Sequence, residues 1–386
     1  MASLDGTVAL VTGAAGGLGG AVASGLAREG ALAVVVGRST TRASEAMAGI
    51  RWLVPGANLE PLVCDLSDQS SIHAAADFLS GHDRLDVLVN AAGVFRKERQ
   101  VTRDGIELTF ATNVMAYFLL TSLLLDALTH HAAAPPSNSR IVNIVSRYGN
   151  ARLNFDDLQT ASGKYSYLRS TPPTMLARVL LTQEFAERLH GTGVVANAVH
   201  PGLVKNTTLL QDVGGPFRWI TNTFGAPAEK AADTPLWLAT SGETAGVSGK
   251  LWAKRKELPT PGMGSDPKLG SACGTRARNW PGCRDGGNVK DEDLRARLKE
   301  LHLPPVTGFF LVDVPEMRFV MVDWRGGPDR PGFSGAIHEG LCAQIMHVGP
   351  NSGEVPTLAR LHSKFLPAHD LVPNGNHHEI YLDDPK

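Results

Sequence analysis

The sequence predicts an α/β protein whose larger part is a doubly wound parallel sheet with helices on both faces. From Thr7 onward, short apolar runs alternate with longer stretches of helical period. Several of these runs are apolar at every position, as expected of strands buried on both faces of a parallel sheet. A glycine-rich segment follows the first run directly and opens a helical stretch, which is a typical strand-to-helix connection of doubly wound sheets. Together these features place the chain in the α/β class.

The elements can be assigned in order along the chain. The first strand, helix and strand are predicted in VALVT, GGAVASGLAREG and ALAVVVG. Further strands follow in LEPLVCDL, RLDVLVNAAG, RIVNIVS and GVVANAVHPG. Helical periodicity marks three stretches between them, Ser70 to Leu79, Leu108 to Thr129 and Leu176 to Leu189. Strands that alternate with helices in this way build a parallel sheet.

A second, smaller unit is predicted after Leu258. Residues 259–287 are dense in Gly and Pro and poor in aliphatic side chains, which indicates a linker or long loop. A short exposed helix is predicted at Asp291 to Leu301, because acids at its start and bases later suit the helix dipole. Strand-like runs begin near Thr307, and a helix is predicted near Thr357 to Phe365. We therefore divide the chain into residues 1–258, a linker with a short helix at 259–304, and a small α+β domain at 305–386.

Composition narrows the classes of function. The 386 residues carry a net charge of -1, and they contain no cluster of Lys and Arg, so the basic surface of a nucleic-acid binder is missing. No run approaches the roughly 20 apolar residues that span a bilayer. The first residues lack the basic and apolar parts of a signal peptide. We expect a cytoplasmic protein without a membrane span, whose partner is a small molecule.

The cysteines do not indicate a disulfide framework or a metal site. They contain no Cys-x-x-Cys pair and are few for a chain of this length, so free thiols are expected at Cys64, Cys273, Cys283 and Cys342. A bridge or shared metal between Cys273 and Cys283 is the alternative. No neighbouring His or Cys would complete such a site, and we predict no metal.

The glycine-rich segment has the context of a dinucleotide phosphate loop. It connects the first strand to the first helix, as the Rossmann fold requires. Gly13 permits a tight turn, and the later glycines let the backbone approach a pyrophosphate at the positive end of the helix. Packing alone is the alternative explanation for glycine in such a turn. The predicted cofactor contacts in the segment are Thr12, Gly13, Gly17, Leu18 and Gly19.

The residue after the second strand bears on the choice between NADP and NAD. An NAD site usually has an acid here, which bonds the ribose 2′-hydroxyl. This chain has Arg38, whose guanidinium suits a 2′-phosphate. A solvated surface arginine is the alternative. NADP(H) is therefore the predicted cofactor, ahead of NAD(H).

Six motifs at characteristic spacing resemble the short-chain dehydrogenases, especially their retinol-dehydrogenase-like branch. They are the Thr-Gly-x-x-x-Gly-x-Gly segment at Thr12, Asp65-Leu66, Asn90-Ala91-Ala92-Gly93, Asn113, Ser146, and His200-Pro201-Gly202. The resemblance covers nearly all of residues 1–256. It implies a homodimer formed through the helices that include Leu108 to Thr129, and hydride transfer between a nicotinamide and an alcohol or carbonyl.

The resemblance also implies roles for single residues. Asp65 and Leu66 would contact the adenine. The bed of the cofactor would be formed by Asn90, Ala91 and Gly93. The residues beside the nicotinamide would be Pro201, Gly202 and Val204.

Carbonyl reduction in this family uses a tyrosine, a lysine four residues later, a serine and an asparagine. The tyrosine donates the proton, and the lysine lowers the pKa of the phenol from about 10. Ser146 and Asn113 match the serine and the asparagine. Aligning the flanking segments places Thr171 at the tyrosine position and Met175 at the lysine position, so neither group is present. Because two prolines follow directly, we predict that Thr171 is an N-cap and that the helix begins after it.

Two tyrosines upstream are the weak candidates for a substitute acid. Tyr165 and Tyr167 lie beside Lys164 and would have to reach the site from a loop. The alternative is that they pack or cover the substrate cleft. Some turnover would remain even without them, because cofactor positioning and polarisation of the carbonyl by Ser146 persist.

The last part of the chain resembles the GyrI-like small-molecule-binding domains. The resemblance rests on VPEMRFVMVD, EGLCAQIMHVGP and HHEIYLDDP, and it implies that Glu379 faces a ligand. A carboxylate in an apolar pocket would favour a cation or act as a base. The middle of the family's domain is missing, so this domain is expected to be incomplete. A surface position on an edge strand is the alternative for Glu379.

These features predict an NADP(H)-dependent oxidoreductase that interconverts an alcohol and a carbonyl on a small apolar substrate, with turnover weakened by the missing Tyr-x-x-x-Lys. The alternative is a cofactor-binding pseudoenzyme whose C-terminal domain senses or sequesters a small molecule. A third hypothesis makes that C-terminal domain the functional part of the chain.

Overall fold

The computed structural model describes residues 3–82, 84–132, 139–205, 215–278 and 280, and four short strands between residues 310 and 344. The chain forms two compact units, residues 1–287 and residues 288–386, and each is described by itself.

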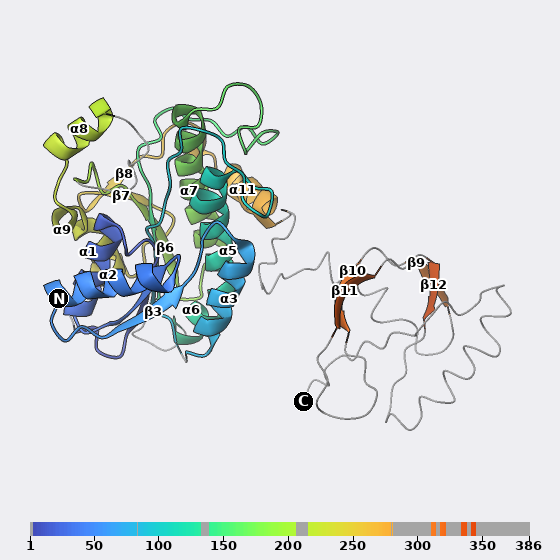
Figure 1. The fold of residues 1–386 in the computed structure, drawn as a ribbon, viewed down its shortest axis with the longest axis horizontal. Coiled ribbons are helices and arrows are strands. Elements are labelled where there is room, and N and C mark those ends of the chain that lie inside the picture. Colours follow the sequence, from blue (N-terminus) through green and yellow to red (C-terminus); the bar gives the residue numbers. More distant parts are fainter. Residues whose placement is uncertain are drawn as a thin grey trace. The chain divides into compact units, whose positions relative to one another are not determined.

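The first unit is built on one eight-stranded sheet with the order β3-β2-β1-β4-β5-β6-β7-β8 (Figure 1). All neighbouring strands are parallel except β7 and β8, which pair in antiparallel fashion. The strand order reverses between β1 and β4, and ligands of such sheets bind in the crevice at this point. The doubly wound Rossmann fold is confirmed. Its strands are β1 Val8–Val11, β2 Leu32–Gly37, β3 Leu59–Val63, β4 Val87–Asn90, β5 Arg140–Ile144, β6 Val195–Val199, β7 Leu251–Ala253 and β8 Lys256–Leu258.

Helices cover both faces of this sheet and enclose two apolar cores. Successive residues of a strand point to opposite faces, so Leu10 enters the core beneath α3, α5 and α7, whereas Ala9 and Val11 enter the core beneath α1, α2 and α10. The helices of the first unit are α1 Gly17–Arg28, α2 Thr40–Leu53, α3 Gln69–Ser80, α4 Leu108–Phe110, α5 Ala116–Leu123, α6 Leu125–Ala132, α7 Tyr167–Arg188, α8 Gly215–Phe224, α9 Ala228–Ala231, α10 Asp233–Thr240 and α11 Pro267–Arg278. A π-helical turn at Ala111–Met115 joins α4 to α5, and 3-10 turns lie at Gly242–Thr244 and Gly262–Ser265.

The described part of the expected linker is folded onto the first unit, which corrects the prediction of a loop at 259–287. Helix α11 packs along α7. Its glycines serve close packing between helices: a Cβ on Gly270 would lie 3.2 Å from the carbonyl oxygen of Leu180, and one on Gly274 would lie 2.9 Å from Cγ of Glu184. Cys273 and Ala277, four residues apart on one face, are buried against the core. Cys273 is a free thiol, as is Cys64.

The second unit is described only in its strands. β9 Phe310–Asp313 pairs with β12 Leu341–Gln344, and β10 Met317–Met321 pairs with β11 Phe333–Ile337, both in antiparallel fashion. The strand-like run after Thr307 thus contains two strands. The helices predicted at Asp291–Leu301 and Thr357–Phe365 lie outside the described residues.

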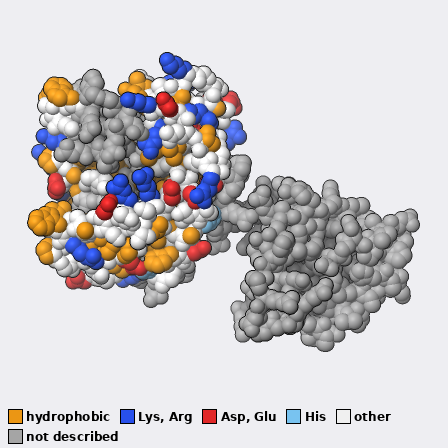
Figure 2. All heavy atoms as spheres, in the orientation of Figure 1, with side chains coloured by type: hydrophobic (Ala, Val, Ile, Leu, Met, Phe, Trp, Pro, Cys, Tyr) orange, Lys and Arg blue, Asp and Glu red, His pale blue; other side chains and the backbone are white. Residues whose placement is uncertain are grey.

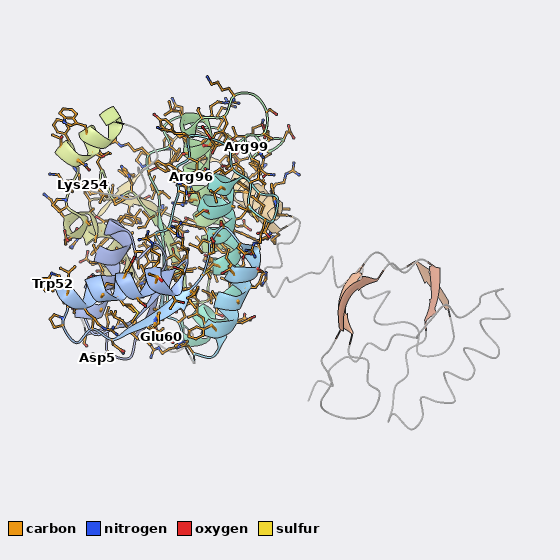
Figure 3. All side chains as sticks on the ribbon, in the orientation of Figure 1. Asp5, Trp52, Glu60, Arg96, Arg99 and Lys254 are labelled. Atoms are coloured by element: carbon orange, nitrogen blue, oxygen red, sulfur yellow. The ribbon has the colours of Figure 1, made fainter. Side chains whose placement is uncertain are left out.

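The surface of the first unit carries mixed charge on the face shown in Figure 2, where basic and acidic side chains are interspersed with apolar ones. Within the described residues, no helix has both the length and the apolar character needed to cross a membrane. Figure 3 shows residues at the two ends of the strands. Asp5 and Glu60 lie near the amino ends of β1 and β3, whereas Arg96 and Arg99, which follow β4, lie at the opposite end of the unit.

Candidate nucleotide and catalytic site

The loop between β1 and α1 is shaped by contacts that only glycine permits. Gly13 has φ +70°, and a Cβ there would lie 2.8 Å from Cα and N of Ala92. A Cβ on Gly19 would lie 2.4 Å from the carbonyl oxygen of Gly13. Gly17 differs, because the nearest atom to its Cβ would be that of Ala228, at 3.7 Å. Gly13 and Gly19 therefore close the loop, whereas Gly17 is exposed and would accept a Cβ in ordinary contact with Ala228.

Helix α1 begins at Gly17. Its N-cap residue, Gly16, supplies no side-chain hydrogen bond to the first turn. The N–H groups of that turn and the positive end of the helix dipole are therefore available to an anion. This cradle fits the pyrophosphate of a dinucleotide.

Thr12 joins this loop to the one that follows β4. Its Oγ1 accepts hydrogen bonds from the backbone N–H groups of Ala91, at 3.0 Å, and Ala92, at 3.2 Å. Its own N–H donates to the carbonyl of Val89, at 3.0 Å. The predicted bed of the cofactor, which includes Gly93, is thus tied to the phosphate loop by one threonine.

The side chain of Asn90 points into the protein interior. Its Nδ2 donates to Oδ1 of Asn143, at 2.9 Å, and to Oγ1 of Thr121, at 3.2 Å. Asn143 in turn donates to Oγ1 of Thr182 on α7, at 2.9 Å. Asn90 therefore fixes the end of β4 relative to β5 and α7.

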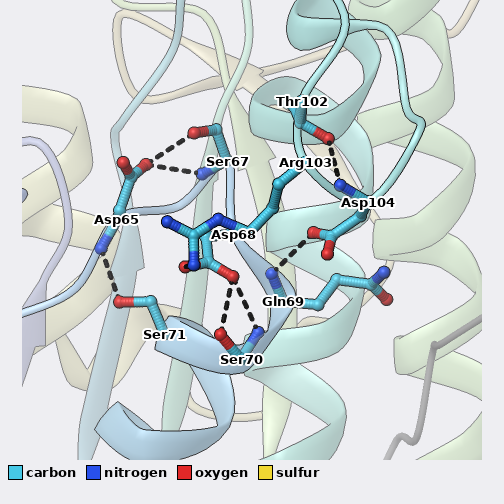
Figure 4. A network of polar contacts seen from close by, with 9 residues as sticks. All are labelled: Asp65, Ser67, Asp68, Gln69, Ser70, Ser71, Thr102, Arg103 and Asp104. Carbon is cyan, nitrogen blue, oxygen red and sulfur yellow. Dashed lines mark hydrogen bonds and ion pairs between the residues drawn. The ribbon is translucent and has the colours of Figure 1, made fainter.

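The residues expected near the adenine and its ribose lie at the ends of β2 and β3. Arg38 is exposed and makes no hydrogen bond or ion pair with the described residues. Oδ1 of Asp65 accepts from the N–H and Oγ of Ser67, at 2.9 and 2.7 Å. Figure 4 shows the other carboxylate oxygen of Asp65 free of these bonds, and shows Arg103 reaching Asp68 from the loop before α4. Leu66 packs at the edge of the core.

Ser146 and Asn113 both lie at the carboxyl ends of the strands, and they differ in burial and in hydrogen bonding. Ser146 is half-buried, two residues after β5. Asn113 lies in the π-helical turn and is fully buried. Its side chain exchanges hydrogen bonds with the backbone of Val94, at 2.9 and 3.0 Å, and donates to Oγ1 of Thr174, at 3.2 Å. The Asn113 side chain is thus fully engaged, and its backbone carbonyl faces α7.

Helix α7 contradicts the prediction that Thr171 is an N-cap. The helix begins at Tyr167, with Ser166 as its N-cap residue, and contains Pro172 and Pro173. The turn before the prolines is stabilised by the carbonyl of Ser166, which accepts from the N–H groups of residues 169 and 170 at 3.0 Å each. A proline has a helical φ but removes its own N–H donor and crowds the carbonyl four residues before it, so this first part of the helix is held against a local cost.

The structure places neither a phenol nor an ammonium at the two replaced positions. Oγ1 of Thr171 is buried and has no hydrogen-bond partner among the described residues. Met175 is 2% exposed, and its Sδ accepts from the backbone N–H of Ser146, at 3.3 Å. A threonine hydroxyl is a weak acid, and a thioether carries no charge.

The two upstream tyrosines are placed at the start of α7. The hydroxyl of Tyr165 donates to Oε1 of Glu107, at 2.8 Å, and lies 3.0 Å from Oγ1 of Thr109. Burial is the main cause that raises the pKa of Tyr165. Tyr165 is thus held at the cap of α4 rather than presented to Ser146. Tyr167 is half-buried, and the structure shows no hydrogen bond from it to Ser146.

Arg178 is a residue of this site that the sequence analysis missed. It lies on α7, one turn after Met175, and its guanidinium donates to the carbonyls of Asn113, Ile144 and Ala92. The available signal was a single charged residue inside the apolar run MLARVLL. Long side chains in such runs often extend to solvent, and this one turns inward.

The segment after β6 has the turn expected of Pro201-Gly202. Gly202 has φ +87°, and Val204 forms a parallel bridge with Ala226. His200, before the turn, is largely buried, and burial lowers its pKa below the ordinary 6.5. Its Nδ1 has no hydrogen-bond partner among the described residues.

Glu379, the predicted ligand residue of the second unit, lies outside the described residues, as do His377 and His378. Within the part of the chain that the structure describes, no three His, Cys, Asp or Glu side chains are grouped to hold a metal ion.

Comparison with known proteins shows which families these features belong to. A family model for short chain dehydrogenases matches residues 7–164, and a model for the GyrI-like small molecule binding domain matches residues 329–386. Human retinol dehydrogenase 14 is 37% identical over 278 residues, which cover 66% of this chain and 80% of the relative. Human retinol dehydrogenase 13 is 34% identical over 273 residues, with 67% and 80% coverage. Human polyprenol dehydrogenase is 34% identical over 258 residues, with 65% and 77% coverage.

Solved structures share the fold. An uncharacterized protein from Mycobacterium paratuberculosis superposes with a TM-score of 0.58 at 25% identity, covering 72% of this chain and 94% of that protein. RhlG from Pseudomonas aeruginosa, in a complex with NADP, superposes with a TM-score of 0.51 at 25% identity, covering 64% and 94%. The chain belongs to the short-chain dehydrogenases, in their retinol-dehydrogenase-like branch, and ends in a GyrI-like segment.

Proposed function

We propose that the protein is an NADP(H)-dependent oxidoreductase that interconverts an alcohol and a carbonyl on a small apolar substrate, with slow turnover. The observation that carries the proposal is the exposed Gly17 at the uncapped start of α1, which fits a dinucleotide. The names of the relatives, retinol dehydrogenase and polyprenol dehydrogenase, refer to apolar alcohols and support that substrate class.

Each part of the site has a task in this reaction. The nicotinamide, when bound, supplies or accepts the hydride. The start of α1 binds the pyrophosphate, and Arg38 binds the 2′-phosphate. The Ser146 hydroxyl donates a hydrogen bond to the carbonyl oxygen of the substrate. With Thr171 at the usual tyrosine position and Met175 at the usual lysine position, no phenol donates the proton from position 171, and the oxygen takes its proton from a weaker acid such as water. Turnover is slow for this reason.

Cofactor preference is tested by Arg38→Ala, with Arg42→Ala as the matched control. Arg38 has no partner among the described residues, whereas Arg42, on the exposed face of α2, pairs with Glu45 at 3.1 Å. Loss of Arg38 is expected to weaken NADPH binding about tenfold or more, because a charge-assisted contact to phosphate is lost. NADH binding should be unchanged. Equal effects of the two variants on NADPH binding would refute the role of Arg38.

The alternative is a cofactor-binding pseudoenzyme whose C-terminal domain binds a small molecule. The replacements at Thr171 and Met175 favour it. NADPH binding and NADPH oxidation are measured on the full chain with a panel of apolar aldehydes and ketones. Saturable binding with no oxidation supports the pseudoenzyme, and oxidation that Ser146→Ala abolishes supports the enzyme.

Two further proposals concern the whole protein. A homodimer formed through the helices that include Leu108 to Thr129 would sediment at twice the 41.1 kDa of one chain, and a single-chain mass would refute it. A cytoplasmic location is tested by fractionation of cells that express the chain, and recovery in the membrane fraction would contradict it.

A further inference from the structure

We propose that Arg178 supplies the positive charge of the catalytic end of the site, in place of the lysine that position 175 lacks, and that it favours the reduced cofactor and carbonyl reduction. The inference rests on the proposed function. It assigns a positioning and electrostatic role to a residue on α7 that lies one turn beyond the usual lysine position.

The guanidinium is fixed by three backbone carbonyls from separate segments. Nε donates to the carbonyl of Asn113 at 2.7 Å, Nη1 to that of Ile144 at 2.8 Å, and Nη2 to that of Ala92 at 2.9 Å. Ile144 is the last residue of β5, and Ala92 follows the end of β4 in the predicted bed of the cofactor. The charge is therefore held between the carboxyl ends of two central strands, where ligands of this fold bind.

This charge is buried and lacks a counter-anion. Arg178 is 3% exposed, its Cζ lies 3.9 Å from the centre of the Tyr117 ring, and no carboxylate among the described residues pairs with it. Burial lowers the pKa of Arg178 below its ordinary value, yet a guanidinium keeps its proton in proteins. Three carbonyl dipoles and one ring face solvate the cation without neutralising it. Its field therefore reaches the adjoining site.

Met175 connects this charge to Ser146. Its Sδ lies 3.9 Å from Nη1 of Arg178 and accepts the backbone N–H of Ser146 at 3.3 Å. The usual ammonium position is thus filled by a neutral sulfur that touches both the cation and the residue expected to polarise the carbonyl. A lysine at this point would place a second positive charge against the first.

A cation at this place acts on both reaction partners. It stabilises the negative charge that develops on the carbonyl oxygen when hydride reaches the carbon. It also repels the positive ring of the oxidised nicotinamide while leaving the neutral reduced ring unaffected. The first effect speeds hydride transfer in both directions, and the second favours reduction over alcohol oxidation.

The test measures dissociation constants of NADPH and NADP⁺ on the full chain by titration calorimetry, for the wild type, Arg178→Gln, Arg178→Lys and Arg140→Gln. Arg140 is the matched control. It is also buried, at 6% exposed, and within the described residues its side chain donates only to the carbonyls of Thr244 and Ser241, at 3.1 and 3.3 Å. It differs in lying at the amino end of β5. The wild type should bind NADPH more tightly than NADP⁺. Arg178→Gln should reduce that ratio about tenfold, while Arg178→Lys and Arg140→Gln keep most of it.

Met175→Glu provides a second arm if Arg178→Gln does not fold. A carboxylate at this position neutralises Arg178 in place, and the NADPH-to-NADP⁺ ratio should fall as it does in Arg178→Gln. An unchanged ratio in either variant, with NADPH still bound, overturns the role of Arg178. Failure of the wild type to bind either cofactor refutes the proposed function instead, so the two failures are distinguishable.

Discussion

Three glycines of the phosphate loop differ in what a side chain would meet. At Gly13 and Gly19 a Cβ would collide with backbone atoms at 2.8 and 2.4 Å, so these residues are required by the fold itself. At Gly17 a Cβ would make only an ordinary contact at 3.7 Å. Gly17 is therefore not required for folding, and it is the exposed first residue of α1, where the pyrophosphate is predicted to bind.

Gly17→Ala is expected to separate folding from binding. The free energy of unfolding should change by less than about 0.5 kcal/mol, because the new methyl group meets no close contact. NADPH binding should weaken at least about tenfold, because the methyl group occupies the approach to the start of α1. Urea unfolding and a fluorescence titration measure the two effects.

Gly49→Ala, on the exposed side of α2 with no atom within 4 Å of its Cβ, is the control. It should raise stability by up to about 1 kcal/mol and leave binding unchanged. If Gly17→Ala binds NADPH as well as Gly49→Ala does, the loop is not the phosphate site.

The positions of the residues predicted to bind the nucleotide could be inferred from the sequence, because each residue follows the end of a strand. Gly13, Arg38 and Asp65 follow the first three strands directly, so the fold itself fixes where they lie. Thr171 and Met175 were predictable as replacements from the flanking sequence. Arg178 was not predictable, because sequence alone does not show whether a lone arginine on an apolar helix extends to solvent or turns inward.

At the scale of elements, α7 carries the departures from the Tyr-x-x-x-Lys pattern. It begins at Tyr167 despite the prolines, and it aligns Thr171, Met175 and Arg178 at the carboxyl edge of the sheet. The prediction of a later start gave too much weight to the prolines, because residues before them are stabilised by the carbonyl of Ser166 and by burial of Ser170. Tertiary packing here overrides local preference.

Met175→Lys should destabilise the protein rather than restore the usual site. The new ammonium would be buried beside Nη1 of Arg178, so the free energy of unfolding should fall by about 3 kcal/mol or more. Adding Arg178→Gln should recover at least about 1 kcal/mol of this loss, because the two charges no longer repel. Urea unfolding of the two single variants and the double variant measures the coupling. Strictly additive effects would contradict the contact between the two positions.

For helix α11, the glycine content led to the wrong prediction of a loop. Its glycines indicate a loop when taken alone, but Gly270 and Gly274 face α7 at distances that exclude larger residues. Whether glycine serves a turn or close helix packing depends on a partner surface that is distant in the sequence. The apolar strand runs carried no such ambiguity, and they predicted the parallel sheet.

At the scale of the whole molecule, Glu184 joins α11 to α7 within the first unit. The side chain is 6% exposed, accepts from Oγ of Ser271 at 3.0 Å, and pairs with Arg278 at 3.4 Å. Glu184→Gln should lower the free energy of unfolding by about 1–3 kcal/mol, because hydrogen bonds to a buried charge are weakened. Urea unfolding measures the change.

Glu45→Gln is the matched control, since the Arg42–Glu45 pair is exposed and should contribute less than about 1 kcal/mol. If the two variants unfold alike, the Glu184 contacts do not stabilise the packing of α11.

The central claim is that the first unit is an NADP(H) site whose nucleotide half is intact. Titration of the full chain with NADPH and NADH, followed by the fluorescence of the reduced nicotinamide, tests it most directly. The expected result is saturable binding of both cofactors, with NADPH bound about tenfold or more tightly because only its 2′-phosphate meets Arg38. Absence of saturable NADPH binding, or tighter binding of NADH, would contradict the claim.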